Sequence, residues 1–152
     1  MIAGIGIENF TAFGNLDIPL SPRINVIIGS NGTGKTHLLK AIYALAMASQ
    51  PTSTAERSKK ETAAKVTQEL MRVFSPGESR IGALGTSGAA RLRLKGGDES
   101  RIGISFNSNS KRVRVERDAS WEAQSRPVFI PTKEVLSLVR AMQDADHDRA
   151  TV

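Results

Sequence analysis

The residues best suited to chemistry form one short run, 29–36, with the sequence GSNGTGKT and the spacing G-x-x-x-x-G-K-[ST]. Glycines let a backbone fold tightly and turn successive N–H groups onto phosphate oxygens, which larger side chains would obstruct. The spacing predicts a triphosphate cradle in which Lys35 contacts the β- and γ-phosphates and the Thr36 hydroxyl binds Mg²⁺. The nucleotide contacts are expected from Gly29, Ser30, Asn31, Gly32, Thr33, Gly34, Lys35, Thr36 and His37.

Such a cradle needs a strand before it and a helix after it, and the neighbouring residues predict both. Residues 24–28 (INVII) form an apolar, β-branched run typical of a buried parallel strand. After the loop, apolar side chains recur at helical spacing to about Ser49, so the helix N-terminus faces the anion. Phe13, in the turn before a strand over 15–20, is a candidate to lie against the adenine, and a place in the core accounts for it equally well.

The rest of the chain predicts a mixed α/β fold. A first strand is expected over 2–10, and a second helix carries its apolar face on Ala63, Val66, Leu70, Val73 and Phe74. Residues 89–118 contain three alternating runs separated by turn residues, which indicates an antiparallel β-meander. A short strand over 128–130 and a further helix follow, and residues 143–152 form a polar tail.

Alternation within the meander separates two sets of side chains. The apolar set is expected to face the core: Leu92, Leu94, Ile102, Ile104, Phe106, Val113 and Val115. The basic set falls on the opposite face: Arg91, Arg93, Lys95, Arg101, Arg112 and Arg114. These six residues form a candidate surface for the backbone of duplex DNA, and the alternative is that they only solubilise an exposed sheet.

Composition limits the remaining function classes. The chain has 152 residues, enough for one domain with a sizeable core, and a net charge of +6. Residues 51–126 hold fifteen basic and nine acidic side chains, so this region carries the whole excess. The absence of cysteine excludes disulfides and thiolate metal sites and favours the cytoplasm. No signal peptide or apolar run of membrane-spanning length is present, so we expect no membrane partner.

The first third of the chain resembles the N-terminal lobe of ABC-type ATPases of the SbcC, RecF and SMC class, within the AAA-family P-loop proteins. A strand ending in Asn9-Phe10 leads to a second strand and then to Asn25-Val26 and the loop, as in that class. The pair Asn31-Gly32 is unusual in P-loop kinases and small GTPases. The resemblance implies an ABC-ATPase-like α/β lobe that is incomplete at its C-terminus, binds ATP and Mg²⁺, and dimerises around ATP. It also implies ATP hydrolysis in DNA repair or DNA-directed defence, and contact with DNA through this lobe.

Other parts that the resemblance implies are absent from the sequence. The resemblance implies a glutamine after the strand 128–130, but Glu134 is found there instead. Glu134 is a candidate catalytic acid, and an ordinary acidic residue in the first turn of a helix is the alternative interpretation. Gln124 lies before that strand and is a weaker candidate. Neither an L-S-G-G-Q signature nor an apolar run ending in Asp-Glu (Walker B) is present, and LGTSG at 84–88 has the wrong order and position. His147 lies between two aspartates in the tail, which indicates solvent exposure rather than a metal site.

These observations predict a nucleotide cradle without catalytic acids. We expect residues 1–142 to form the lobe, with a homodimer mate or a partner chain supplying the signature and Walker B motifs, and negligible turnover by this chain alone. Two alternatives remain open at this point. One is that the chain is a truncated fragment without activity. The other is that it is a small-molecule P-loop kinase, which would need a lid arginine and a base on the acceptor side.

Overall fold

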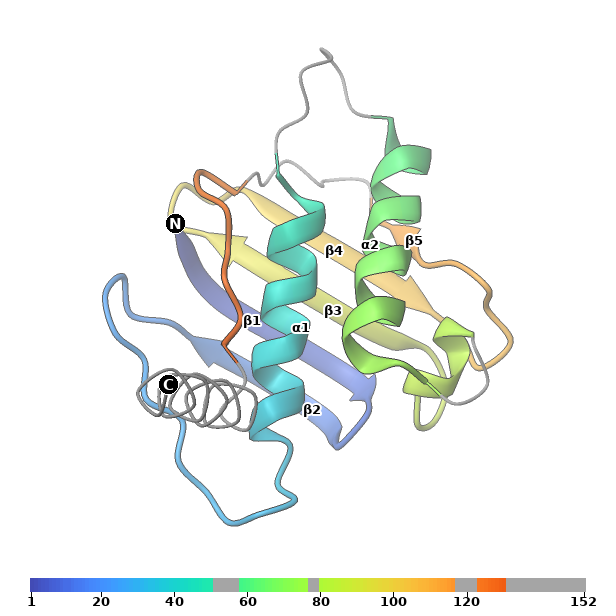
Figure 1. Ribbon diagram of the computed structural model, residues 1–152, viewed down its shortest axis with the longest axis horizontal. Helices are drawn as coiled ribbons and strands as arrows, with labels where there is room; N and C mark the ends of the chain where they lie inside the picture. Colours follow the sequence, from blue (N-terminus) through green and yellow to red (C-terminus); the bar gives the residue numbers. More distant parts are fainter. Residues whose placement is uncertain (51–57, 77–79, 117–122, 131–152) are drawn as a thin grey trace, which may run out of the picture.

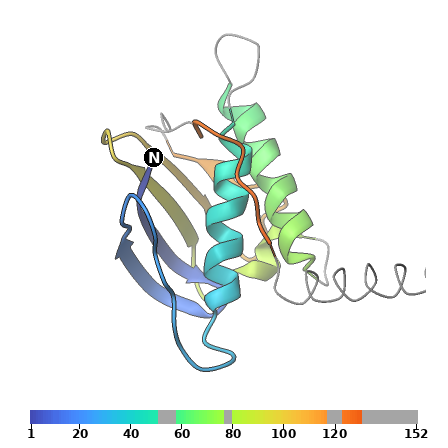
Figure 2. The same ribbon diagram turned by 60° about the vertical axis from the view of Figure 1, so that its left-hand side comes forward.

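In the computed structural model, which describes residues 1–50, 58–76, 80–116 and 123–130, two helices cover one face of a five-stranded antiparallel sheet (Figure 1). The elements follow in the order β1 (Ile2–Phe10), β2 (Phe13–Pro19), α1 (Lys35–Ala48), α2 (Lys59–Phe74), the 3₁₀ helix η1 (Ile81–Leu84), β3 (Ala90–Gly96), β4 (Arg101–Phe106) and β5 (Arg114–Val115). The strand order across the sheet is β2-β1-β3-β4-β5. Figure 2 shows both helices on the same side, with the other face of the sheet uncovered by any described element.

The sheet forms because its strands alternate apolar and polar side chains in matching register. Ile5 and Ile7 of β1 lie opposite Leu94 and Leu92 of β3, and all four are buried beneath the helices. The meander is confirmed, with a third strand of only two residues. The predicted core face is confirmed too, because its residues are buried apart from Val115, which is partly buried. β2 begins two residues before the expected strand and ends one residue earlier.

The two helices differ in the side chains that they bury. α1 buries alanines and leucines, and its small Ala41 and Ala44 side chains are completely inaccessible. α2 is amphipathic, with Val66 and Leu70 buried against the rest of the core. Both helices were expected from apolar periodicity, and α1 ends within one residue of the expected position.

The strands expected over 24–28, as a buried parallel strand, and over 128–130 are wrong. Segments 24–28 and 128–130 have no regular secondary structure and pair with no strand in the described part of the chain, and most of their apolar side chains are exposed. A parallel strand is stable when strands or helices cover both of its faces, and the described residues supply no such cover here. One contact holds the second segment: the ring of Phe129 lies 5.8 Å from that of Tyr43 on α1. The exposed side chains are Ile24 (80%), Val26 (79%), Ile28 (88%), Val128 (77%) and Ile130 (68%).

Several expectations fall outside the described residues. These are the helix after residue 130, the polar tail 143–152, His147 and most of the loop expected over 49–58. Among the described residues, no helix has both the length and the apolar character needed to cross a membrane.

Candidate nucleotide-binding site

The N-terminus of α1 lacks the side-chain cap that would normally satisfy its first N–H groups. The helix has Gly34 at its N-cap and no acidic residue in its first turn, and its first bond runs from the Leu38 N–H to the Gly34 carbonyl, 2.9 Å away. The N–H groups of Lys35, Thr36 and His37 therefore have no acceptor within the helix. The positive end of the helix dipole is open to an anion.

α2 shows the opposite arrangement in the same chain. Its N-cap Ser58 and its Glu61 form a reciprocal capping box, with the Ser58 side chain accepting from the Glu61 N–H at 3.2 Å. The carboxylate of Glu61 in turn accepts from the Ser58 N–H at 3.2 Å. α2 thus satisfies its own first turn with side chains, whereas α1 has no side-chain cap for its first N–H groups.

Positive backbone φ angles explain two of the loop glycines. Gly32 and Gly34 have φ of 84° and 89°, values that side chains rarely tolerate. Gly34 has a second reason, because a Cβ on it would lie 2.8 Å from the ring of Phe13 and 3.0 Å from the Cβ of Ala12. The loop therefore approaches the turn between β1 and β2 as closely as a glycine allows.

The Lys35 side chain lies against the backbone of the loop. Its Nζ donates to the carbonyl oxygens of Gly29 and Ser30, each at 2.6 Å, and the Thr33 hydroxyl donates to the same Ser30 carbonyl at 2.9 Å. The Thr36 side chain is exposed, and its hydroxyl bonds to nothing in the described part of the chain. A charged amine and a free hydroxyl thus stand beside the open helix end, which is the donor set that a Mg²⁺-bound triphosphate requires.

Phe13 and His37 occupy different surroundings. Phe13 is half-buried against Gly34, so its ring borders the loop. The His37 ring packs edge-on against Phe74 with centroids 5.6 Å apart, and its buried Nδ1 has no hydrogen-bond partner among the described residues. His37 can therefore offer a nucleotide its backbone N–H, while its ring belongs to the contact between α1 and α2.

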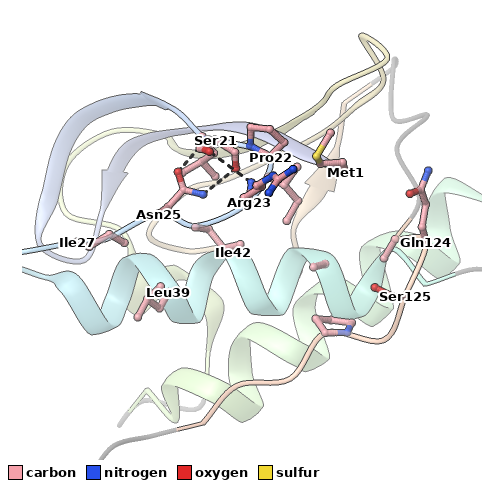
Figure 3. Close-up of a pocket in the computed structure, with 15 residues that line it drawn as sticks. Met1, Ser21, Pro22, Arg23, Asn25, Ile27, Leu39, Ile42, Gln124 and Ser125 are labelled. Atoms are coloured by element: carbon pink, nitrogen blue, oxygen red, sulfur yellow. Dashed lines mark hydrogen bonds between the residues drawn. The ribbon is translucent and has the colours of Figure 1, made fainter.

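A cavity of about 440 Å³ lies beside α1 and away from the loop, as none of residues 29–36 lines it (Figure 3). Its walls are mostly apolar and include Ile27, Leu39 and Ile42. A turn closes one side, in which the Asn25 side chain accepts from the Ser21 N–H at 2.7 Å and donates to the Ser21 carbonyl at 2.9 Å. The cavity adjoins the exposed segment 24–28, and its lining includes one cationic side chain, Arg23, but none of the loop residues 29–36.

On the open face of the sheet, acidic residues from β1 and β2 neutralise part of the predicted basic set. Arg91 donates to Glu8 at 2.7 Å, and Arg93 reaches both Glu8 at 3.2 Å and Glu116 at 3.3 Å. The hydrogen bond from Arg91, together with the charges of Arg91 and Arg93, holds the pKa of Glu8 below its usual range. Lys95 pairs with Asp17 at 3.1 Å.

The remaining basic residues lie toward the β5 end of that face. Arg112 and Arg114 are exposed and make no ion pair with any described residue. Arg101 is exposed and lies opposite Lys95 in the register. The alternation identified the face correctly but did not indicate the acids, because Glu8 and Asp17 lie about eighty residues away in the sequence.

The other sequence candidates do not join the loop. Gln124 is exposed and lines the 440 Å³ cavity. The segment 84–88 links η1 to β3, and its Thr86 N–H donates to the Asn9 carbonyl at 3.0 Å, so it has a structural role. Glu134 lies outside the described residues.

Comparison with known proteins gives consistent results. Residues 5–138 match the family described as AAA domain. The chain is 35% identical over 102 residues to the DNA replication and repair protein RecF of Streptococcus uberis, covering 66% of this chain and 25% of that protein. The RecF protein of Bacillus cytotoxicus is 39% identical over 56 residues, covering 37% of this chain and 15% of that protein. The chain therefore spans a quarter or less of the length of these curated relatives.

A solved structure shares the fold. It belongs to work described as "Structural biochemistry of ATP-driven dimerization and DNA stimulated activation of SMC ATPases", and the alignment has a TM-score of 0.53 at 16% identity. The alignment covers 91% of this chain and 90% of the solved one. At that identity the likeness shows the fold alone.

Proposed function

The chain belongs to the AAA domain family as an N-terminal lobe of the ABC-type SbcC, RecF and SMC class, and from this we propose that residues 29–36 bind the triphosphate of Mg-ATP. The single observation that carries the proposal is the uncapped N-terminus of α1 beside the Lys35 amine. A helix that leaves its first N–H groups without side-chain partners, next to a cation, is built for an anion.

Each loop residue has a defined role in this proposal. The N–H groups of the loop and of the first turn of α1 contact phosphate oxygens, and Lys35 moves from the Gly29 and Ser30 carbonyls to the β- and γ-phosphates. The Thr36 hydroxyl holds Mg²⁺, which neutralises charge on the phosphates when it is bound. Phe13, at the edge of the loop, lies against the adenine.

Hydrolysis requires groups that this sequence does not contain. Phosphoryl transfer depends on positioning and on electrostatic stabilisation of the transition state. The sequence contains no Walker B acid or signature motif that would supply this stabilisation. We propose that a further polypeptide segment, in a dimer mate or a partner chain, supplies them to the lobe 1–142, with 143–152 as a polar tail. The exposed apolar side chains of 24–28 and 128–130 support this, because exposed apolar surface is typical of a site that another polypeptide segment covers.

We propose a DNA-directed role, in repair or defence, and the names of the relatives support its connection with DNA. The RecF proteins are named for DNA replication and repair, and the solved structure is described in terms of DNA-stimulated SMC ATPases. Such a role fits the cytoplasmic location expected from a cysteine-free chain. The open face of the sheet would make the DNA contact.

Calorimetric titration of Mg-ATP tests the nucleotide site. Lys35→Ala removes a charged donor worth about 1.5–3 kcal/mol, so affinity should fall by roughly 10- to 150-fold. Lys40→Ala is the matched control, because Lys40 lies on the next turn of α1 with its amine 5.7 Å from the Phe74 ring centroid. Equal affinity of the wild type and Lys35→Ala would contradict the assignment.

Phosphate release measured on the same samples tests the missing acids. The wild-type chain alone should give negligible turnover. Release that depends on Lys35 and reaches ordinary rates of about 1 s⁻¹ or more would show that the chain needs no partner. That result would direct attention to Glu134 as the acid.

A further inference from the structure

A polar cavity of about 260 Å³ opens where β3, β4 and β5 meet the loop between the last two. Its lining includes three arginines and three short polar side chains, and we refer to these six as the arginine corner. They are Arg91, Arg112, Arg114, Ser105, Asn107 and Ser110. The corner is separate from the nucleotide loop, because none of residues 29–36 lines it.

The strand register sets the spacing of the corner. Ser105 of β4 lies opposite Arg91 of β3 on one side and opposite Arg114 of β5 on the other. Neighbouring strands are about 4.8 Å apart, so the two arginine stems stand roughly 10 Å apart on the same face. The short Ser105 side chain between them leaves the space open, and both guanidinium groups can reach into it.

The corner contains two basic residues of the sheet face that have no carboxylate partner among the described residues. Arg93 has two carboxylate partners and Lys95 has one. Arg91 shares its charge with Glu8, whereas Arg112 and Arg114 have no ion pair with any residue that the structure describes. A polyanion approaching this face therefore meets its strongest uncompensated field at the β5 end, not at the centre of the sheet.

The loop that completes the corner is fixed in place. The Ser110 hydroxyl oxygen accepts from the Asn107 N–H at 2.9 Å, so the hydroxyl proton remains available to donate elsewhere. The Ser110 carbonyl accepts from the Gly82 N–H of η1 at 3.2 Å. The corner thus offers the Ser110 hydroxyl as a donor together with planar arginine forks, which match the oxygens of a phosphate.

We infer that the arginine corner binds a backbone phosphate of duplex DNA and that the DNA contact of this face is concentrated there. Serine, asparagine and arginine are the side chains that commonly contact DNA phosphates. The one aromatic residue in the lining, Phe106, is buried in the core and offers no ring for base stacking, so single strands gain nothing beyond charge. The inference rests on the proposed DNA-directed role, and it narrows the six-residue basic set to its β5 end.

Fluorescence anisotropy with a short labelled duplex tests the inference over a range of salt concentrations. Arg112→Gln with Arg114→Gln removes two unpaired charges, and Arg93→Gln with Lys95→Gln removes two paired ones as a matched control. Each neutralised phosphate contributes about 0.9 to the slope of log affinity against log salt. The corner pair should lower the slope by about 1, as expected for the loss of one phosphate contact, and weaken binding at low salt, while the control pair leaves the slope nearly unchanged.

Three results would overturn the inference. Equal losses for the two pairs would show a face-wide contact, and absence of duplex binding by the wild type would remove the DNA contact altogether. Displacement of the duplex by inorganic phosphate, beyond that by chloride of equal ionic strength, would show a free-phosphate site. The nucleotide proposal is tested independently, because Lys35→Ala should lose ATP binding and keep duplex binding. Unfolding midpoints verify that each variant is folded, as expected for the exposed Arg112 and Arg114.

Discussion

Replacing Gly34 by alanine puts a methyl group where the loop 29–36 meets the turn between β1 and β2. The new Cβ would lie 2.8 Å from the Cζ atom of Phe13 and 3.0 Å from the Cβ of Ala12. Gly32 provides a matched comparison in the same loop. It has nearly the same φ, 84° against 89°, and nothing within 4 Å of a Cβ.

The structure separates two contributions to the free energy of unfolding. Left-handed backbone strain affects both alanine variants alike and costs about 1–2 kcal/mol. Overpacking affects only Gly34→Ala and adds about 1–3 kcal/mol. Gly34→Ala should therefore unfold about 2–12 °C below Gly32→Ala, at about 2–4 °C per kcal/mol for a chain of this size.

Thermal unfolding of the two variants, with and without Phe13→Ala, measures the difference. Removing the ring should recover part of the extra loss in Gly34→Ala and nothing in Gly32→Ala, since Phe13 contacts only the first position. Equal midpoints for the two single variants, or additive effects of Gly34→Ala and Phe13→Ala, would refute the close approach of loop and turn. The arrangement of the nucleotide site around Phe13 would then be wrong as well.

Two further predictions concern the sheet. The pKa of Glu8 is lower in the folded state than in the unfolded chain. Its ion pairs therefore stabilise the fold fully above the unfolded pKa of about 4.3, and this stabilisation is lost as pH falls through the folded pKa. Glu8→Gln should cost up to about 1 kcal/mol at pH 7 and should flatten the loss of stability below pH ~4.3, as measured by urea unfolding. Gly82→Ala should cost about 1–3 kcal/mol or more, because its Cβ would overlap the Ser108 carbonyl oxygen, whereas at Gly103 the Cβ meets only the flexible Glu116 carboxylate. Chemical unfolding of both alanine variants checks this, and an equal loss at the two positions would contradict it.

The sequence was sufficient for the elements that it specifies locally. The glycine spacing, the helical periodicity after Lys35 and the alternation around Leu92 and Leu94 each depend on neighbours a few residues away, and the corresponding loop, α1 and β3 are present. The alternation also assigned the arginines of the meander to the face opposite the core. Local patterns of this kind are strong because the backbone geometry of a helix or strand dictates them directly.

Contacts between residues far apart in the sequence could not be predicted in the same way. The run 24–28 has the composition of a buried strand, but composition cannot show whether a neighbouring strand is available, and here none is described. The pairing of Glu8 with Arg91 depends on β1 lying next to β3, which joins residues 83 positions apart. The contact between Phe13 and Gly34 likewise depends on the path of the chain between them, and no local signal marks it.

The position of Lys35 against the loop has a consequence for side-chain entropy. A free lysine samples many rotamers, and ordering it on a ligand costs about 0.5–1.5 kcal/mol. Here two carbonyl oxygens at 2.6 Å already hold the amine, so folding has met that entropic cost before a nucleotide arrives. A triphosphate then exchanges one set of acceptors for another around an ordered cation, and the loop is preorganised in its side chain as well as in its backbone.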